Sequence, residues 1–404
     1  MAQARLLEII EMLRSRDKVV RKQAAIRLKA LAENGLTAGE CQLAFKAATE
    51  DWGHLKKIDM SRVLVVAAIL SPQFPSPAII AEFAPRFSAA ALYDGIEFLT
   101  SQHSATSAAA YLSIVEQHLS LALEADVPVA GFAASAQAVE VLFPRLFNYT
   151  QYPQFKRRIH ELALAACEKG TFPQAALTKL ALSALETFRP LRARMRPMER
   201  SGDDDWIWVE EYTDYRWQAA LLLDLMGYLP GTEIVAELQA ALESADPQVK
   251  CFGAVGLLRH GQDVPVTALE SVAASAEMRN WFHFALTSLG RTEFFPPRFA
   301  THEAFAQSNM VSWLAFPTEL ARTPHEIELM ATFPGATSDQ RYYLFRFRTH
   351  EYDGWMAGLS GPFSVGASPA PAEGKATWSS FTAWDKKTPR EHFAELTEIR
   401  QHPE

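Results

Sequence analysis

Apolar residues recur at helical spacing from the N-terminus to about residue 290, and this periodicity constrains the fold more than any other feature of the chain. The apolar stretches end at short breaks of Pro, Gly, Ser or Asp, and strand-like alternation is almost absent. Within 17–31, Val20, Ala24, Leu28 and Leu31 fall on one helix face. The other segments predicted to be helical are 78–87, 89–99, 105–121, 130–147, 155–167, 174–188, 215–228 and 233–242.

Three helical segments can be superimposed on one another. They begin at Asp17, Asp246 and Ser275, residues that can cap a helix. In each segment an apolar residue and then a base follow the cap; the pairs are Val20-Arg21, Val249-Lys250 and Met278-Arg279. Small residues then allow a neighbouring helix to approach closely; they include Ala25, Gly253 and Ala254.

This pattern resembles HEAT repeats, specifically the short variety found in many bacterial proteins. The resemblance is good over 232–290, fair at the N-terminus and architectural between them. It implies a mainly α fold, in which residues 1–290 form a HEAT/ARM-like α-solenoid of stacked helix pairs. A generic helical bundle is the alternative.

The pattern changes after Arg291, where we expect a small α+β region over 291–404. Segment 309–333 is predicted to be helical, despite Pro317 and Pro324. Alternation in 342–348 predicts a strand, and 355–363 and 376–384 predict two more. Thr388 and Glu391 form a capping-box pattern, which predicts a terminal helix over 389–399. The stretches 313–320 and 354–358 look like the C-terminal region of bacterial HEAT-repeat proteins, some of which are thought to be immunity proteins against secreted toxins.

Charge and composition restrict the classes of partner and compartment. The formal net charge of -8 weighs against nucleic acid as the main partner. Cys41, Cys167 and Cys251 are far apart and form no CxxC pair, which favours reduced thiols in a cytosol. The first residues do not form a secretory signal. The longest apolar run, 63–70, is too short to cross a bilayer. We therefore expect a cytoplasmic protein that does not enter a membrane.

Sequence signatures of catalysis are missing. The sequence contains no GxSxG, GxxxxGK[ST], GxGxxG or HExxH motif. We therefore expect no catalytic residue, no cofactor and no metal ligand, and hence no enzyme. A site assembled from distant positions stays open at this stage.

An acidic and aromatic insertion over 199–216 departs most from a plain helical repeat. It contains seven acidic and two basic residues, a local net charge of -5 (2 − 7), and its start overlaps a run of five arginines at positions 189, 192, 194, 196 and 200. Rigid aromatic rings beside carboxylates suit a surface that binds a basic protein. The predicted partner-binding residues are Asp203, Asp204, Asp205, Trp206, Trp208, Glu210, Glu211, Tyr212, Asp214 and Tyr215. In the structural alternative, Trp206, Trp208 and Tyr212 are core residues of an inserted helix or hairpin, and the five arginines pair with the acids of this insertion.

A helical repeat offers an open binding face, and with no catalytic motif this favours binding over reaction. The sequence therefore predicts a protein-binding chain, specifically an immunity protein that occludes the active site of a bacterial toxin, such as a basic nuclease-like effector. A HEAT-like DNA glycosylase is the alternative from the enzyme class. A scaffold or assembly chaperone is the third possibility.

Overall fold

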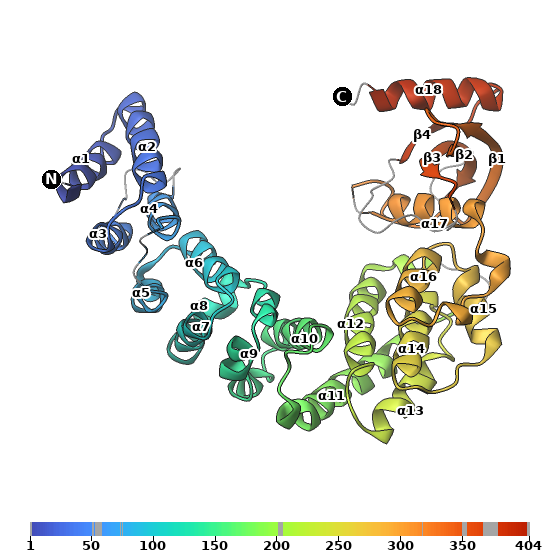
Figure 1. Ribbon diagram of the computed structural model, residues 1–404, viewed down its shortest axis with the longest axis horizontal. Coiled ribbons are helices and arrows are strands. Elements are labelled where there is room, and N and C mark those ends of the chain that lie inside the picture. The colour runs from blue at the N-terminus through green and yellow to red at the C-terminus, as the bar shows by residue number, and fades with distance from the viewer. Residues whose placement is uncertain are drawn as a thin grey trace. The chain divides into compact units, whose positions relative to one another are not determined.

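The computed structural model describes residues 2–50, 52, 59–72, 74, 76–200, 205–316, 318–349, 354–366 and 379–401. These residues are mainly helical and include one small antiparallel sheet near the C-terminus (Figure 1). Contacts divide the chain into two compact units, Met1–Ser183 and Ala184–Glu404. This division lies within the predicted helical region, and the predicted boundary at residue 290 stays a prediction.

The first unit is a double row of helices. Helix α1 contacts α3, α3 contacts α5, α5 contacts α7 and α7 contacts α9; α2, α4, α6 and α8 contact one another in the same order (Figure 1). Between the rows, α1 packs on α2 and α3 on α4. The helices are α1 (Ala2–Leu13), α2 (Lys18–Glu33), α3 (Ala38–Ala48), α4 (Met60–Ile69), α5 (Ala78–Phe83), α6 (Ala89–Ser101), α7 (Ala105–Gln117), α8 (Leu119–Ala125), α9 (Ala136–Leu142), α10 (Pro153–Glu168) and the start of α11 (Leu177–Met195).

Helix caps and breaks in this unit follow local chemistry. Asp17 caps α2 as predicted, because its carboxylate accepts from the Val19 N–H at 2.8 Å. The segment 105–121 is two helices rather than one, with His118 between them. The segment 130–147 is also broken: Phe143 is extended before Pro144, which lacks an N–H and disfavours helix at the residue before it. Ala25 is exposed, so it mediates no close helix contact.

The helical part of the second unit is centred on α14 (Pro247–Arg259), which contacts four other helices. At Gly253 an added Cβ would lie 2.8 Å from the Cβ of Ala241, which confirms the close approach predicted there. The neighbours of α14 are α12 (Glu210–Met226), α13 (Thr232–Ala241), α15 (Val266–Ala274) and α16 (Arg279–Ser288).

The predicted cap of α14 is confirmed, and the predicted cap of α16 is wrong. Asp246 caps α14 as predicted, accepting from the Gln248 N–H at 2.8 Å. Ser275 does not cap α16, which begins only at Arg279. The Arg279 guanidinium donates to the carbonyls of Ala273 and Ala274 at 2.8 and 3.0 Å, and a turn separates α15 from α16 there. This contact takes up carbonyls that the end of α15 leaves without helical partners.

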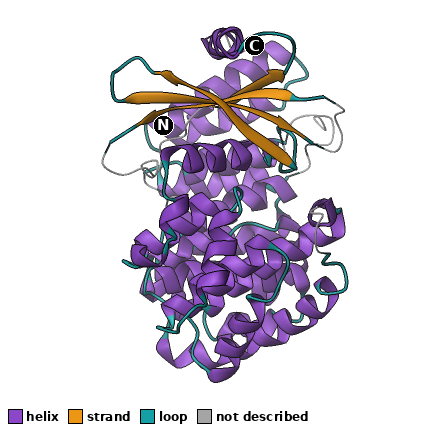
Figure 2. Cartoon of the chain, turned by 90° about the vertical axis from the view of Figure 1, so that its right-hand side faces the viewer, coloured by secondary structure: helices purple, strands orange, loops and turns teal. Residues whose placement is uncertain are grey.

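The sheet of the second unit lies between two helices (Figures 1 and 2). Its strands are β1 (Glu326–Pro334), β2 (Gln340–Arg348), β3 (Met356–Ser364) and β4 (Ser379–Ala383), antiparallel and in sequence order. As the alternation in 342–348 predicts, Tyr343, Phe345 and Phe347 pack with α17 (His302–Leu314). Leu344 faces the other way and packs with Leu396 of α18 (Pro389–Gln401).

Two predictions for the C-terminal region are changed by the structure. The sheet has four strands instead of three, and the predicted helix over 309–333 is wrong beyond α17, because 326–333 belongs to β1. Residues 326–333 form a strand because they pair with β2. This pairing includes an ion pair between Glu328 and Arg346 at 2.6 Å. The terminal helix is confirmed: the Thr388 N–H and hydroxyl both donate to Glu391 at 2.7 Å, the predicted capping box.

Among the residues that the structure describes, no helix combines the length and apolar character required to span a bilayer.

Candidate functional site

The acidic and aromatic insertion folds into a short 3-10 helix, Asp205–Trp208, and the first turns of α12. Its side chains divide between two faces of the fold. Trp206 and Tyr212 are buried, while Glu210, Glu211 and Asp214 are exposed. Asp205, Trp208 and Tyr215 are half-buried. Two further predicted residues, Asp203 and Asp204, lie outside the described residues.

On the buried face, Tyr212 has no exposed surface and its hydroxyl donates to Asp246 Oδ2 at 3.1 Å. The ring of Trp206 meets the Tyr212 ring edge-on, with centroids 4.6 Å apart. Burial raises the pKa of Tyr212, and the carboxylate of Asp246 raises it further. These two aromatic residues thus belong to the core, as the structural alternative has it, and the binding proposal below does not use them.

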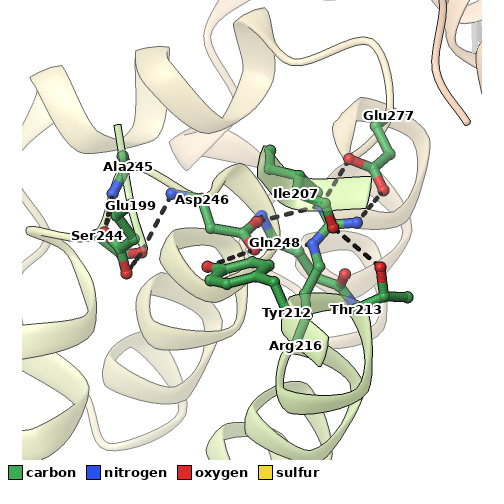
Figure 3. Close-up of polar contacts among 10 residues, drawn as sticks. All are labelled: Glu199, Ile207, Tyr212, Thr213, Arg216, Ser244, Ala245, Asp246, Gln248 and Glu277. Carbon is green, nitrogen blue, oxygen red and sulfur yellow. Dashed lines mark hydrogen bonds and ion pairs between the residues drawn. The ribbon is translucent and has the colours of Figure 1, made fainter. Parts of the chain in front are cut away.

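Arg216 is the centre of the buried face, where it binds two carboxylates (Figure 3). Its Nε donates to Asp246 Oδ2 at 2.8 Å and its Nη2 to Asp246 Oδ1 at 3.1 Å. Its Nη1 and Nη2 also donate to Glu277, at 2.8 and 2.7 Å. Burial lowers the pKa of Arg216, but the two carboxylates outweigh burial and hold the pKa above its ordinary value. Trp208 covers the guanidinium, whose carbon lies 5.6 Å from the ring centroid.

We call Tyr212, Arg216, Asp246 and Glu277 the Arg216 cluster. It connects α12 to the N-terminus of α14, which Asp246 caps, and to the turn before α16, where Glu277 lies. Glu199 supports the same corner, since it accepts from the Ser244 hydroxyl at 2.9 Å and the Ala245 N–H at 2.8 Å (Figure 3).

The contacts of the Arg216 cluster indicate a structural role, because its charged groups bind one another. All three guanidinium nitrogens donate to carboxylates of the chain itself. Asp246 is fully buried and Glu277 is mostly so, with 19% of its side chain exposed. Buried, mutually paired charges of this kind hold helices in one arrangement. Removal of one charged partner leaves the others buried without an opposite charge.

The opposite side of α12 faces solvent. We call Val209, Glu210, Glu211, Asp214, Tyr215 and Trp217 the outer face of α12. Val209 is 50% exposed and Trp217 is 63% exposed. The Tyr215 hydroxyl donates to Glu211 at 2.7 Å, and this hydrogen bond raises the pKa of Tyr215. The outer face thus combines three exposed carboxylates with one large exposed ring.

Trp217 and Arg216 are not among the residues predicted from the sequence, although signals for both were present. Trp217 comes three residues after Asp214, which places both on one face once the helix is known to begin at Glu210. Arg216 stands as far before Gly227 as Lys250 stands before Gly261 and Arg279 before Gly290. The same spacing thus occurs in α12, with Tyr212 at the position that Asp246 and Ser275 occupy in the other two segments.

Two of the five arginines, Arg189 and Arg192, pair with acids of α13 and not, as the structural alternative had it, with those of the insertion, while Arg194 interacts with the Tyr215 hydroxyl. Arg189 donates to Glu237 of α13 at 2.8 Å, and Arg192 lies 2.7 Å from the same carboxylate. Arg189 also binds Glu233 at 2.5 Å. These pairs leave the carboxylates of the outer face of α12 to other contacts.

Other reactive groups form no site in the part of the chain that the structure describes. Cys41 and Cys251 are buried and Cys167 is half-buried; burial raises the pKa of all three thiols, which disfavours the nucleophilic thiolate. No group of three or more His, Cys, Asp or Glu side chains is placed to hold a metal ion within those residues.

Comparison with known proteins gave no relative on which to base an identification. No protein-family model matches the chain, and no significant match was found among curated proteins or solved structures.

Proposed function

We propose that the chain is a helical-repeat protein of the α-solenoid type, and that it binds a basic protein through the outer face of α12. The helix rows of the first unit and the α12–α14–α16 series of the second support the repeat architecture. The observation that carries the binding proposal is Trp217, 63% exposed on the same helix face as Asp214.

The outer face has the properties of a protein-binding surface. A large ring supplies contact area at small cost in side-chain entropy, and tryptophan is enriched among residues that dominate binding energy. Carboxylates around such an anchor accelerate encounter with a positively charged partner and disfavour acidic ones. The formal net charge of -8 acts in the same direction at longer range.

In its more specific form, the proposal is that the protein is a cytoplasmic bacterial immunity protein. It neutralises a toxin, such as a basic nuclease-like effector, by covering the surface that binds the toxin's polyanionic substrate. The mechanism is steric and electrostatic occlusion, and no bond is made or broken. The resemblance of the stretches 313–320 and 354–358 to the C-terminal region of bacterial HEAT-repeat proteins supports this form of the proposal.

The test compares capture of partner proteins by the wild type and by Glu210→Lys/Asp214→Lys/Trp217→Ala. A matched control, Glu243→Lys/Asp263→Lys, reverses two exposed carboxylates elsewhere in the same unit. We expect the wild type and the control to capture the same basic protein and the triple variant to lose it. The captured protein is then purified, and its enzymatic activity is titrated with the wild type.

The outcomes separate the parts of the proposal. Equal capture by all three proteins contradicts the role of the outer face. Loss of capture in the triple variant, with the captured partner still fully active when the wild type is bound, contradicts occlusion and favours a scaffold. Salt-sensitive retention of DNA by the wild type would favour the glycosylase alternative.

A further inference from the structure

A second aromatic group, partly exposed, lies on α14, which contacts α12, and on α16, which contacts α14. Phe252 of α14 and Trp281 of α16 are half-buried, and their ring centroids are 4.1 Å apart. Phe284, one turn further along α16 than Trp281, is 43% exposed. We call these three residues the α14–α16 aromatic surface.

The remaining sides of α16 are covered by the unit itself, which shows that this surface is a distinct face. His283 packs edge-on against Phe295 and Phe305, with centroids 4.9 Å away in each case. The backbone N–H of Asn280 donates a hydrogen bond to Ser308 Oγ of α17 at 3.1 Å. Trp281 and Phe284 project from the side that these contacts leave open.

The aromatic surface continues toward the outer face of α12. Helix α14 contacts both α12 and α16, so the three helices form one series. Measured back from Gly227, Gly261 and Gly290, the positions of Gln218, Phe252 and Trp281 are equivalent. Gln218 is exposed and follows Trp217 directly, so the position of α12 that is equivalent to Phe252 and Trp281 adjoins the outer face of α12.

We propose that the α14–α16 aromatic surface is the apolar half of the site whose acidic half is the outer face of α12. Its occupant is a protein segment in which lysine or arginine flanks an aromatic or aliphatic side chain. The cations meet Glu210 and Asp214, and the apolar side chain packs on Trp281 and Phe284. Charge complementarity selects this occupant, because acidic segments are repelled and purely apolar ones gain nothing from the carboxylates. This inference rests on the function proposed above and specifies its partner.

A display library of random linear peptides is a suitable probe, since it contains every combination of charge and apolar residues. Peptides are selected on the wild type, and one enriched sequence is synthesised for affinity measurements. The variants are Phe284→Ala, Trp281→Leu and Glu210→Lys/Asp214→Lys. The control is Leu329→Ala on β1, because Leu329 is 42% exposed and thus matches Phe284. Circular dichroism checks that each variant is folded.

We expect the enriched peptides to combine Lys or Arg with an aromatic or aliphatic residue. Phe284→Ala and the α12 double variant should each weaken binding at least about tenfold, whereas Leu329→Ala should leave it unchanged. If the α12 variant weakens binding and Phe284→Ala and Trp281→Leu do not, the inference is overturned while the function proposed above stands. If enrichment yields no basic peptide, or if the α12 variant binds normally, both are overturned.

Discussion

The two faces of α12 carry similar residues and use them in opposite ways. Inside, Tyr212 and Arg216 meet the carboxylates of Asp246 and Glu277, and every group is held by another part of the chain. Outside, carboxylates and Trp217 project into solvent. Residue type alone therefore does not distinguish a structural cluster such as the Arg216 cluster from a binding surface. The distinction depends on which groups the fold brings opposite each side chain.

Arg216→Met should produce the largest change in stability. It removes the charge but keeps most of the volume, and it leaves Asp246 and Glu277 buried beside each other. Breaking a buried ion pair from one side costs about 3–5 kcal/mol. Urea unfolding should show this loss, with the slope against denaturant unchanged.

The matched control is Asp214→Asn, which removes a charge from the outer face. Exposed substitutions away from special features change stability by about 0.5 kcal/mol or less. Equal losses for Arg216→Met and Asp214→Asn would show that the two faces do not differ in the way the structure indicates.

The same substitution at two tyrosines gives a finer comparison. Tyr212→Phe should cost about 1 kcal/mol, because a buried hydroxyl loses its bond to Asp246. Tyr215→Phe should cost less than about 0.5 kcal/mol, since its bond to Glu211 is exposed to water. Thermal unfolding of the two variants in parallel measures the difference. Equal values would indicate that Tyr212 is solvated.

Alkaline pH should remove the contribution of Tyr212 to stability. Burial holds the pKa of folded Tyr212 above that of the unfolded chain. Its contribution is therefore fully present below about pH 10, the unfolded pKa, and is lost as pH rises above it. The stability difference between wild type and Tyr212→Phe should shrink by up to about 1.4 kcal/mol per pH unit above that point. Urea unfolding between pH 8 and about 11 tests this. A constant difference would contradict the raised pKa.

The sequence was sufficient for the mainly helical character of the chain, the caps at Asp17, Asp246 and Thr388, and the alternation of β2, because these depend on neighbours along the chain. It did not give the breaks within 105–121 and 130–147. It was insufficient for β1, whose strand character depends on pairing with β2, a contact that periodicity within 309–333 does not encode. Periodicity likewise does not encode the contact of the Arg279 side chain, at the start of α16, with the end of α15.

For the candidate site, the sequence located the segment but did not separate its faces. The predicted helix began at Tyr215, whereas α12 begins at Glu210. With the earlier start, Tyr212 and Arg216 fall on one side and Asp214 and Trp217 on the other. The carboxylates that hold Arg216 come from positions 30 and 61 residues later in the chain. Only the tertiary fold brings them to α12.

Charge reversal at the start of α12 should have a small effect on stability. Glu210 and Glu211 lie in the first helical turn, where negative charge interacts favourably with the helix dipole. Glu210→Lys should therefore cost about 0.3–1 kcal/mol, and the cost should diminish as salt is added. Chemical unfolding at low and high ionic strength measures both. A cost that salt does not change would place Glu210 in a specific contact instead.

Trp217→Ala should have the smallest effect on stability and the largest effect on binding. With 63% of its surface exposed, Trp217 contributes little to the core, and alanine has a higher helix propensity. The free energy of unfolding should thus change by less than about 0.5 kcal/mol, whereas affinity for the basic peptide should fall at least about tenfold. Parallel measurement of unfolding and peptide affinity decides the point. A destabilised variant would show that Trp217 supports the fold. The outer face of α12 would then not differ from the buried face at Trp217, the residue on which the distinction mainly rests.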